Sequence, residues 1–496
     1  MSLGRRGAPP WLMLVVATGC GRSGFEQLAC RPGDGTPLCA FVDGDSDLPG
    51  DGGPTTNRNV DPTIIASTSY DGAQRFGGTG ADQSWSVATD DTGTVFITGS
   101  FSATVDFGDG PRTSGGGADG FVASLDAAGA LRWVKTFGSA GDDEGRGVVV
   151  DGGGTVTIVG SVSSSVDLGC GATGEIGSRD VLVARLTAAG ACLSSAVYGS
   201  AGVSSTGQGL ALGPAGDVAI AATIAGATDF GGGLVDYNGM NDAVAVRFDA
   251  GGAFVWARAL GSTTNDYVAA IAVSTDGDVF MSGAFTGPLA CDGGTLTPGP
   301  TGRDIFLVAL DALGADDWCG GFSPDNSASA TALATDTAGN VYLAGDFIGS
   351  LDLGGGALGN AGNTDAFIAS FTPTGTHRWS LPIGGAVADH MVDIVVDADV
   401  ILWLVGYFAL TLDFGASQLV SNGSLQDVAI LAMDLEGAPL RGWSFGGTAY
   451  DFAYGVALAG TSCLEVTGRT DADVDFGGGV LPEKGGADAF VLEVCW

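Results

Sequence analysis

The feature that most constrains this chain is a repeat of 61 or 62 residues that runs from Phe76 to the C-terminus. An aromatic or aliphatic residue, usually followed by glycine, opens each copy at Phe76, Phe137, Tyr198, Leu260, Phe322, Ile383 and Phe445. An aspartate that opens an apolar run keeps the same rhythm at Asp119, Asp180, Asp242, Asp304, Asp365, Asp427 and Asp488. A third marker, Asp-[Phe/Leu]-Gly, recurs at Asp106, Asp167, Asp229, Asp352, Asp413 and Asp475, and the fourth copy places Cys291 there. Three markers in register over seven copies indicate a repeat architecture.

Each copy contains four short segments with the composition of β-strands. In the fifth copy they span 330–336, 340–347, 365–371 and 376–382, and turn-forming residues separate them. The segment "NVYLAG" is apolar on both faces, as expected for a strand covered by neighbouring sheets on both sides. No helical periodicity of useful length interrupts the repeat, so an all-β fold is predicted.

Seven four-stranded units predict a seven-bladed β-propeller, in which sheets pack radially around a channel. A solenoid is the alternative, but it would need distinct polar caps at its ends. The seventh copy stops after its third strand at "DAFVLEVCW", and residues 64–75 precede the first marker where a fourth strand belongs. We therefore expect a propeller domain over 63–496, with its ring closed by the N-terminal strand.

The repeat resembles a known bacterial sequence family. The segments "DDTGTVFITGSF", "STDGDVFMSGAF" and "DTAGNVYLAGDF" are followed by strands such as "DAFIASF" and by Trp133, Trp256 or Trp379. In these features the chain is similar to the SBBP β-propeller repeat over roughly 64–496. The resemblance implies a seven-bladed propeller in an exported bacterial protein, and it implies little about ligand or activity. The tryptophans, together with Trp318, are expected to pack between blades.

The N-terminus has the pattern of an export signal. Arg5 and Arg6 precede the apolar run 11–17, which is far shorter than a membrane span. The following "ATGC" resembles a bacterial lipobox, and this resemblance implies a signal peptide over 1–19 and lipidation of Cys20. Ala17 departs from the usual leucine, so ordinary cleavage and secretion remain the alternative. Residues 20–62 are polar and rich in Gly, Pro and Asp, as a flexible tether should be. The expected location is the bacterial cell envelope, as an outer-membrane lipoprotein or at the cell surface.

The charge is strongly one-sided. Asp and Glu number 56 against 19 Lys and Arg, a formal net charge of −37. A phosphate backbone would be repelled by such a surface, so nucleic acid is a poor partner. The two histidines, His377 and His390, are too few for a multi-histidine metal site and leave little room for histidine-based catalysis.

Eight cysteines besides Cys20 fall in neighbouring pairs. Export permits disulfides, and no CxxC or nearby histidine supports the competing metal-binding interpretation. Four disulfides are predicted: Cys30–Cys39, Cys170–Cys192, Cys291–Cys319 and Cys463–Cys495.

An aspartate stands six residues after the opening marker in five of the seven copies. These residues are Asp82, Asp143, Asp266, Asp389 and Asp451, with Ser204 and Ala328 in the other two copies. They immediately precede the strand nearest the channel, so they could form a ring of carboxylates at its mouth that favours Ca²⁺. The competing interpretation is that each aspartate bonds the backbone N–H groups of its own loop. No other cofactor is expected.

The sequence offers no catalytic residue with a diagnostic motif. It contains neither an HExxH metalloprotease motif nor a GxxxxGK[ST] phosphate loop. The favoured function is a non-enzymatic, extracytoplasmic and monomeric scaffold, anchored to the membrane by its lipid, that binds a protein or glycan. The binding surface would be its loop face, the face with the long loops between the second and third strands of each blade and between one blade and the next. The alternative is an extracytoplasmic polysaccharide hydrolase or lyase that uses carboxylates on that face.

Overall fold

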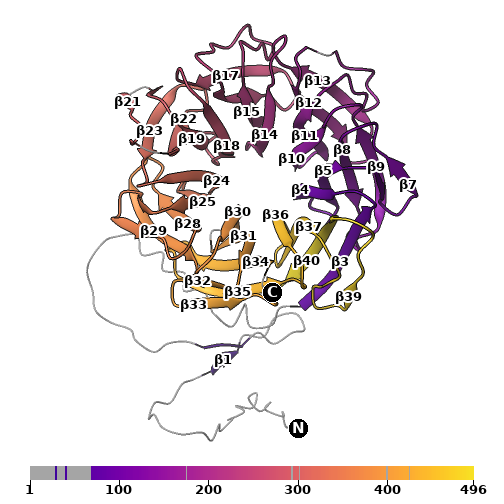
Figure 1. The fold of residues 1–496 in the computed structure, drawn as a ribbon, viewed down its shortest axis with the longest axis vertical. Coiled ribbons are helices and arrows are strands. Elements are labelled where there is room, and N and C mark those ends of the chain that lie inside the picture. The colour runs from indigo at the N-terminus through magenta and orange to yellow at the C-terminus, as the bar shows by residue number, and fades with distance from the viewer. Residues whose placement is uncertain are drawn as a thin grey trace, which may run out of the picture. The chain divides into compact units, whose positions relative to one another are not determined.

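The computed structural model describes residues 28–30, 39–41 and 69–496, except 175, 292–293, 301, 398–399 and 424. The chain divides into two compact units, 1–58 and 59–496. In the first unit, β1 (Leu28–Cys30) and β2 (Cys39–Phe41) form an antiparallel hairpin. The second unit is a ring of β-sheets (Figure 1). Among the described residues, no helix is long and apolar enough to span a membrane.

Seven antiparallel four-stranded sheets form the blades, as the repeat predicts, and each runs outward from a strand beside the central opening (Figure 1). Blade 1 holds β4 (Asp82–Thr89), β5 (Val95–Phe101), β8 (Asp119–Leu125) and β9 (Leu131–Phe137). Blade 2 holds β10 (Glu144–Val150), β11 (Thr155–Val162), β12 (Asp180–Thr187) and β13 (Cys192–Tyr198). Blade 3 holds β14 (Thr206–Leu212), β15 (Val218–Ile224), β16 (Asp242–Phe248) and β17 (Phe254–Leu260).

The remaining blades follow the same plan. Blade 4 holds β18 (Asp266–Val273), β19 (Val279–Phe285), β22 (Asp304–Leu310) and β23 (Asp316–Phe322). Blade 5 holds β24 (Ser327–Thr335), β25 (Val341–Ile348), β28 (Asp365–Phe371) and β29 (His377–Gly384). Blade 6 holds β30 (His390–Asp397), β31 (Ile401–Ala409), β34 (Gln426–Asp434) and β35 (Pro439–Phe445). Blade 7 holds β36 (Asp451–Ala459), β37 (Cys463–Thr470), β40 (Asp488–Cys495) and the N-terminal strand β3 (Ser69–Gly78).

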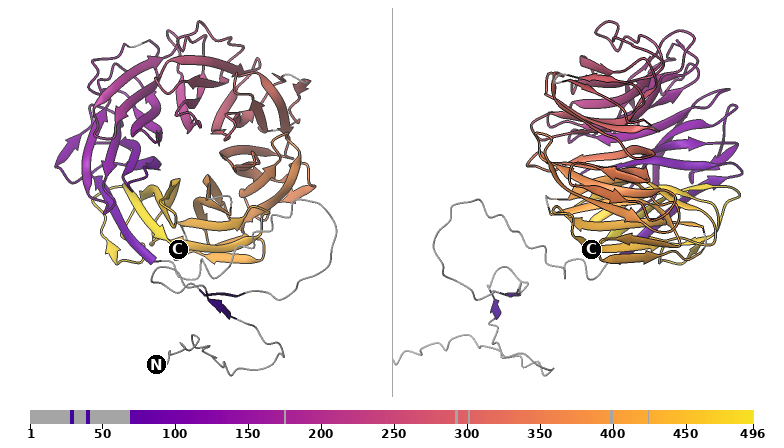
Figure 2. Two further views of the ribbon diagram at one scale, coloured as in Figure 1. Left: turned by 180° about the vertical axis from the view of Figure 1, so that it is seen from behind. Right: turned by 60° about the vertical axis from the view of Figure 1, so that its left-hand side comes forward.

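The ring closes through this last blade, which confirms the prediction made from the incomplete seventh copy. Strand β3 pairs antiparallel with β40, with Phe76 opposite Ala489, and Figure 2 shows β3 along the outside of the yellow blade. The buried Arg75 Nε lies 2.6 Å from Asp488 Oδ2 and adds an ion pair to this seam. The two ends of the propeller are therefore held together by one sheet.

Short hairpins between the second and third strands are the part of the fold that the sequence did not predict. They are β6–β7 (Thr104–Asp106, Pro111–Thr113), β20–β21 (Leu289–Cys291, Gly294–Leu296), β26–β27 (Ser350–Asp352, Ala357–Gly359), β32–β33 (Thr411–Phe414, Ser417–Val420) and β38–β39 (Val474–Asp475, Val480–Leu481). In the fifth copy, Asp352 Oδ1 accepts the N–H groups of Gly354 and Gly356 at 2.8 and 3.0 Å. Both glycines have positive φ, which explains why this turn needs glycine. The Asp-[Phe/Leu]-Gly marker is thus a turn signal.

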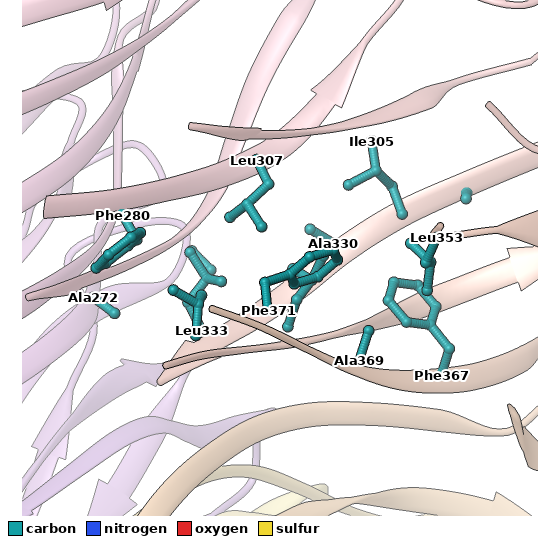
Figure 3. Close-up of a cluster of buried hydrophobic side chains, with 14 of the residues drawn as sticks. Ala272, Phe280, Ile305, Leu307, Ala330, Leu333, Leu353, Phe367, Ala369 and Phe371 are labelled. Carbon is teal, nitrogen blue, oxygen red and sulfur yellow. The ribbon is translucent and has the colours of Figure 1, made fainter. Parts of the chain in front are cut away.

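The hydrophobic core lies between neighbouring blades. Figure 3 shows Phe280, Ile305 and Leu307 of blade 4 packed against Leu333 and Phe371 of blade 5. The second and third strands of blade 1 and the second strands of blades 3 and 4 are buried on both faces, since sheets cover them from both sides.

The recurrent tryptophans pack between blades, as predicted. Each donates its indole N–H to a carbonyl in the turn between the third and fourth strands of the following blade. The pairs are Trp133 with Ala188, Trp256 with Ala312, Trp318 with Pro373, and Trp379 with Leu435. The same side chain therefore links blade 1 to blade 2, and blades 3, 4 and 5 each to the blade that follows.

Candidate functional site

The innermost strand of every blade carries a β-bulge at the same repeat position. The strand register skips one residue there, and the skipped residues are Trp85, Arg146, Gln208, Ala269, Thr331, Val392 and Tyr454. All seven line a central cavity of about 610 Å³. A bulge re-aims a side chain relative to the regular ladder, and bulges are over-represented next to active sites. The channel wall is therefore a ring of seven equivalent positions, one from each blade.

These seven positions hold very different side chains. Blades 7, 1, 2 and 3 contribute Tyr454, Trp85, Arg146 and Gln208, whereas blades 4, 5 and 6 contribute only Ala269, Thr331 and Val392. The backbone ring is nearly symmetric, but one side of the cavity is bulky and polar and the other is small. The two sides of the cavity therefore offer a ligand different contacts.

Three of these residues form a cluster of contacting side chains that spans three blades. The ring centroids of Trp85 and Tyr454 lie 4.5 Å apart, and the Arg146 guanidinium carbon lies 4.3 Å from the Trp85 ring centroid. Burial raises the pKa of Tyr454 to about 12, so its hydroxyl stays protonated and can donate a hydrogen bond at neutral pH. We refer to Trp85, Arg146 and Tyr454 as the channel cluster.

An aromatic ladder on blade 7 leads from this cluster toward the loop face. Tyr450, Phe452 and Tyr454 alternate along the strand, with successive ring centroids 5.8 and 6.0 Å apart and nearly parallel. Tyr450 is 42% exposed, so the ladder begins at solvent. The Arg469 guanidinium carbon lies 4.8 Å from the Phe452 ring centroid.

A histidine–aspartate pair lies on blades 6 and 5, and neither residue lines the central cavity. His390 Nδ1 is 2.8 Å from Asp346 Oδ2, and the His390 ring lies 4.9 Å from the ring of Tyr407. Tyr407 in turn meets Phe452 edge to face at 4.6 Å. Burial disfavours a charged imidazole, but the hydrogen bond and charge of Asp346 outweigh it and raise the pKa of His390. The pair is thus continuous with the aromatic ladder.

This second group of residues was not predicted from the sequence. Asp346, Tyr407 and Arg469 occupy one repeat position near the end of the second strand, in blades 5, 6 and 7. The first four blades place small residues there, namely Ser100, Ser161, Thr223 and Ala284. Comparing each position across the seven copies for an exchange of small for large polar residues would have found it.

The five aspartates predicted as a cation ring are buried in the turns that join one blade to the next. Four accept the backbone N–H of the residue four positions earlier: Asp143 from Ser139, Asp266 from Ser262, Asp389 from Gly385 and Asp451 from Gly447, at 2.6 to 3.0 Å. Asp82 is buried at the equivalent place. This is the geometry of the loop-capping interpretation, and Ca²⁺ binding by these residues stays a prediction.

The surroundings of Asp82, Asp389 and Asp451 favour the protonated carboxyl over the charged carboxylate. Burial, reinforced by the charge of Asp488, raises the pKa of Asp82 to about 7. Burial likewise raises the pKa of Asp389 to about 7 and that of Asp451 to about 6, and the neighbouring Asp365 and Asp427 act in the same direction. Within the described ranges, one group of three potential metal ligands comes together, Cys463, Glu493 and Cys495, and its two cysteines are joined as a disulfide.

Three of the four predicted disulfides are present: Cys170–Cys192, Cys291–Cys319 and Cys463–Cys495. The backbones of Cys30 and Cys39 lie opposite each other in the β1–β2 hairpin, and their side chains lie outside what the structure describes. The lipidation site predicted at Cys20 also lies outside the described residues.

A Gly-x-Ser-x-Gly sequence at 442–446 has no nucleophile geometry. Ser444 lies within strand β35, whereas a nucleophile elbow needs a sharp turn between a strand and a helix. The hydroxyl of Ser444 reaches the carbonyl of Val420 at 3.4 Å. This serine therefore has a structural environment.

Comparison with known proteins identifies no family for the chain. No family model matches the chain, so the SBBP resemblance stays a prediction. Over 195 residues the chain is 27% identical to the regulatory protein FlaEY of Caulobacter vibrioides, covering 37% of this chain and 20% of that protein. The chain thus spans about a fifth of the length of this curated relative.

Solved structures align over most of the propeller at low identity. The Neurospora crassa Pan2 WD40 domain aligns with TM-score 0.42 and 11% identity over 86% of this chain and 95% of that one. Sqt1 from Chaetomium thermophilum aligns with TM-score 0.41 and 12% identity over 86% of this chain and 99% of that one. A protein of unknown function from Dyadobacter fermentans aligns with TM-score 0.40 and 12% identity over 87% of this chain and 100% of that one.

Proposed function

We propose that the protein is a non-enzymatic, extracytoplasmic binding scaffold, anchored through Cys20, that holds a glycan in its central channel. The observation that carries this proposal is the ring of seven bulge residues, which is bulky and aromatic on one side of the cavity and small on the other. A cavity of about 610 Å³ is within the range of ligand sites, roughly 300–1,000 Å³.

Several features support a glycan as the ligand. Tyrosine and tryptophan side chains combine an apolar ring with a polar tip, which suits the apolar faces and hydroxyl edges of a sugar. The ladder that ends at the 42% exposed Tyr450 would guide an extended chain from the loop face to the channel cluster. Three disulfides suit an oxidising compartment outside the cytoplasm.

A channel-blocking variant tests the proposal. Ala269→Trp fills the small side of the cavity, and we expect it to abolish glycan-array binding that the wild-type protein shows. Leu313→Trp is the matched control, because Leu313 is on the same blade, outside the cavity lining, and 81% exposed. Equal glycan binding by the two variants would show that the channel is not the binding site. If the wild-type protein captures only proteins in a pull-down and binds no glycan, the ligand is a protein and the glycan proposal is wrong.

The Asp346–His390 pair favours one second candidate, a polysaccharide lyase or hydrolase. A carboxylate on Nδ1 orients an imidazole so that its other nitrogen can act as a general base. Polysaccharides that the protein binds should be incubated with it and the reducing ends counted. If bonds are cleaved by the wild-type protein and not by His390→Ala, the scaffold proposal is wrong and the enzyme replaces it.

A further inference from the structure

Arg146 has the one positive charge among the residues that line the cavity. It sits at the bulge of blade 2, and the other charged residue of the lining is Asp393 on blade 6. The Asp393 carboxylate accepts the backbone N–H groups of Ile394 and Val456, both at 2.9 Å, and burial raises its pKa to about 6. The Asp393 carboxylate is therefore already engaged by backbone groups of the channel wall. The positive charge of Arg146 stands out because the net charge of the chain is −37.

The environment of Arg146 fixes its orientation. The indole of Trp85 covers the guanidinium, whose carbon is 4.3 Å from the ring centroid. On the stem side, Arg146 Nε lies 3.0 Å from Glu144 Oε2. The indole face and the Glu144 carboxylate limit the orientations of the guanidinium, whose two terminal nitrogens lie in one plane and suit a bidentate acceptor.

Glu144 does not neutralise the site, because it serves two arginines. Its Oε1 pairs with Arg179, while its Oε2 pairs with Arg146. The group of Arg146, Arg179 and Glu144 thus carries one net positive charge. The side chains of Arg146 and Arg179 remain 32% and 27% exposed, so solvent or a ligand can reach them. Among the described residues, the terminal nitrogens of Arg146 have no hydrogen-bond partner in the protein.

We propose that Arg146, supported by Arg179, binds the carboxylate of an acidic sugar in the channel. The two terminal N–H groups of Arg146 match the two oxygens of a carboxylate, and the half-buried site strengthens this charged contact relative to water. Tyr454, beside Trp85, lies in the same cluster and can donate to a sugar hydroxyl. This inference rests on the proposed glycan-binding function and names its ligand as a uronic-acid glycan.

Calorimetry with a matched pair of probes tests the inference. Oligogalacturonate and its fully methyl-esterified form share one backbone and differ in whether the carboxylate is charged. We expect the wild-type protein to bind the acid form at least about tenfold more tightly, and Arg146→Ala to remove that preference while leaving the ester unaffected. Arg146→Lys keeps the charge without the planar fork and should recover part of the preference. Arg112→Ala is the control, because Arg112 pairs with Asp109 on an outer hairpin.

The outcomes separate this inference from the proposed function. If the wild-type protein binds both forms equally and Ala269→Trp blocks both, the scaffold stands and the carboxylate site is wrong. The same holds if Arg146→Ala changes nothing or lowers both affinities alike. If sulfated dextran or a short poly-glutamate peptide shows the Arg146-dependent preference in place of oligogalacturonate, the sugar acid is wrong. If no glycan binds at all, the proposed function itself fails.

Discussion

The turns that join the blades and the wall of the channel follow opposite rules. At the turns the seven copies agree: an aspartate is the first or second residue of the third strand in every copy, and a glycine usually follows the opening marker. At the seven bulge positions a few residues away, the copies hold tryptophan, arginine, glutamine, alanine, threonine, valine and tyrosine. Agreement is needed where each blade must meet its neighbour in the same way. The copies differ at the residues that line the central cavity, and these are the residues that would contact a ligand.

The largest expected effect comes from adding one methyl group at a blade junction. A Cβ on Gly261 would lie 2.1 Å from the Asp242 carboxyl carbon, so Gly261→Ala should displace the buried aspartate and cost about 3 kcal/mol of unfolding free energy. A Cβ on Gly209, at the bulge of blade 3 that lines the cavity, would meet nothing within 4 Å. Gly209→Ala should change stability by less than about 0.5 kcal/mol.

Urea unfolding of the two alanine variants against the wild-type protein measures this difference. Similar midpoints for both variants would mean that the junction and the channel wall tolerate change equally, and the contrast between the two regions would be lost.

The second prediction concerns pH and the junction carboxylates. Burial raises the pKa of Asp82 and Asp389 to about 7 and that of Asp451 to about 6, from a usual value of 3.8. The folded state therefore binds these protons more tightly than the unfolded chain. Their stabilisation is complete below about pH 3.8 and is lost as the pH rises toward 7, so stability from this source should fall between pH 4 and 7.

Asp389→Asn isolates one such group. The charge of Asp365 adds to the burial of Asp389, whereas the positive charge of His390 works against it. The amide cannot ionise, so the variant should lose part of the pH dependence and compare more favourably with the wild-type protein at pH 8 than at pH 5, by about 1 kcal/mol. Thermal unfolding across this range measures it. In the fifth copy Ala328 stands at the position that Asp389 occupies in the sixth, so the fold tolerates the absence of this carboxylate. Parallel pH profiles for the two proteins would contradict the prediction.

The sequence predicted the parts of the molecule in which the seven copies agree and not those in which they differ. Markers such as Asp119 and Trp133 repeat, so register across the copies revealed seven blades, the closing strand and the packing role of the tryptophans. The candidate site was not predicted because its residues are those that differ from copy to copy. Trp85, Arg146 and Tyr454 are far apart in the chain, and only the ring geometry and the shared bulge bring them together. Likewise His390 and Asp346 are 44 residues apart on different blades, so a lone histidine gave no reason to expect a partner.

The smallest expected effect on stability belongs to the channel wall. The side chain of Arg146 is 32% exposed, and its pairing with Glu144 is that of a partly solvated ion pair, worth about 0–1 kcal/mol. Its contact with Trp85 adds about 0.5–1 kcal/mol. Arg146→Ala should therefore lower the free energy of unfolding by about 0.5–2 kcal/mol, even though it is the change we expect to remove the preference for acidic glycans. Chemical denaturation and calorimetry on the same preparation measure both quantities. A loss of stability as large as that of Gly261→Ala would make Arg146 a structural residue of the ring, because a side chain selected for a ligand should be nearly dispensable to the fold.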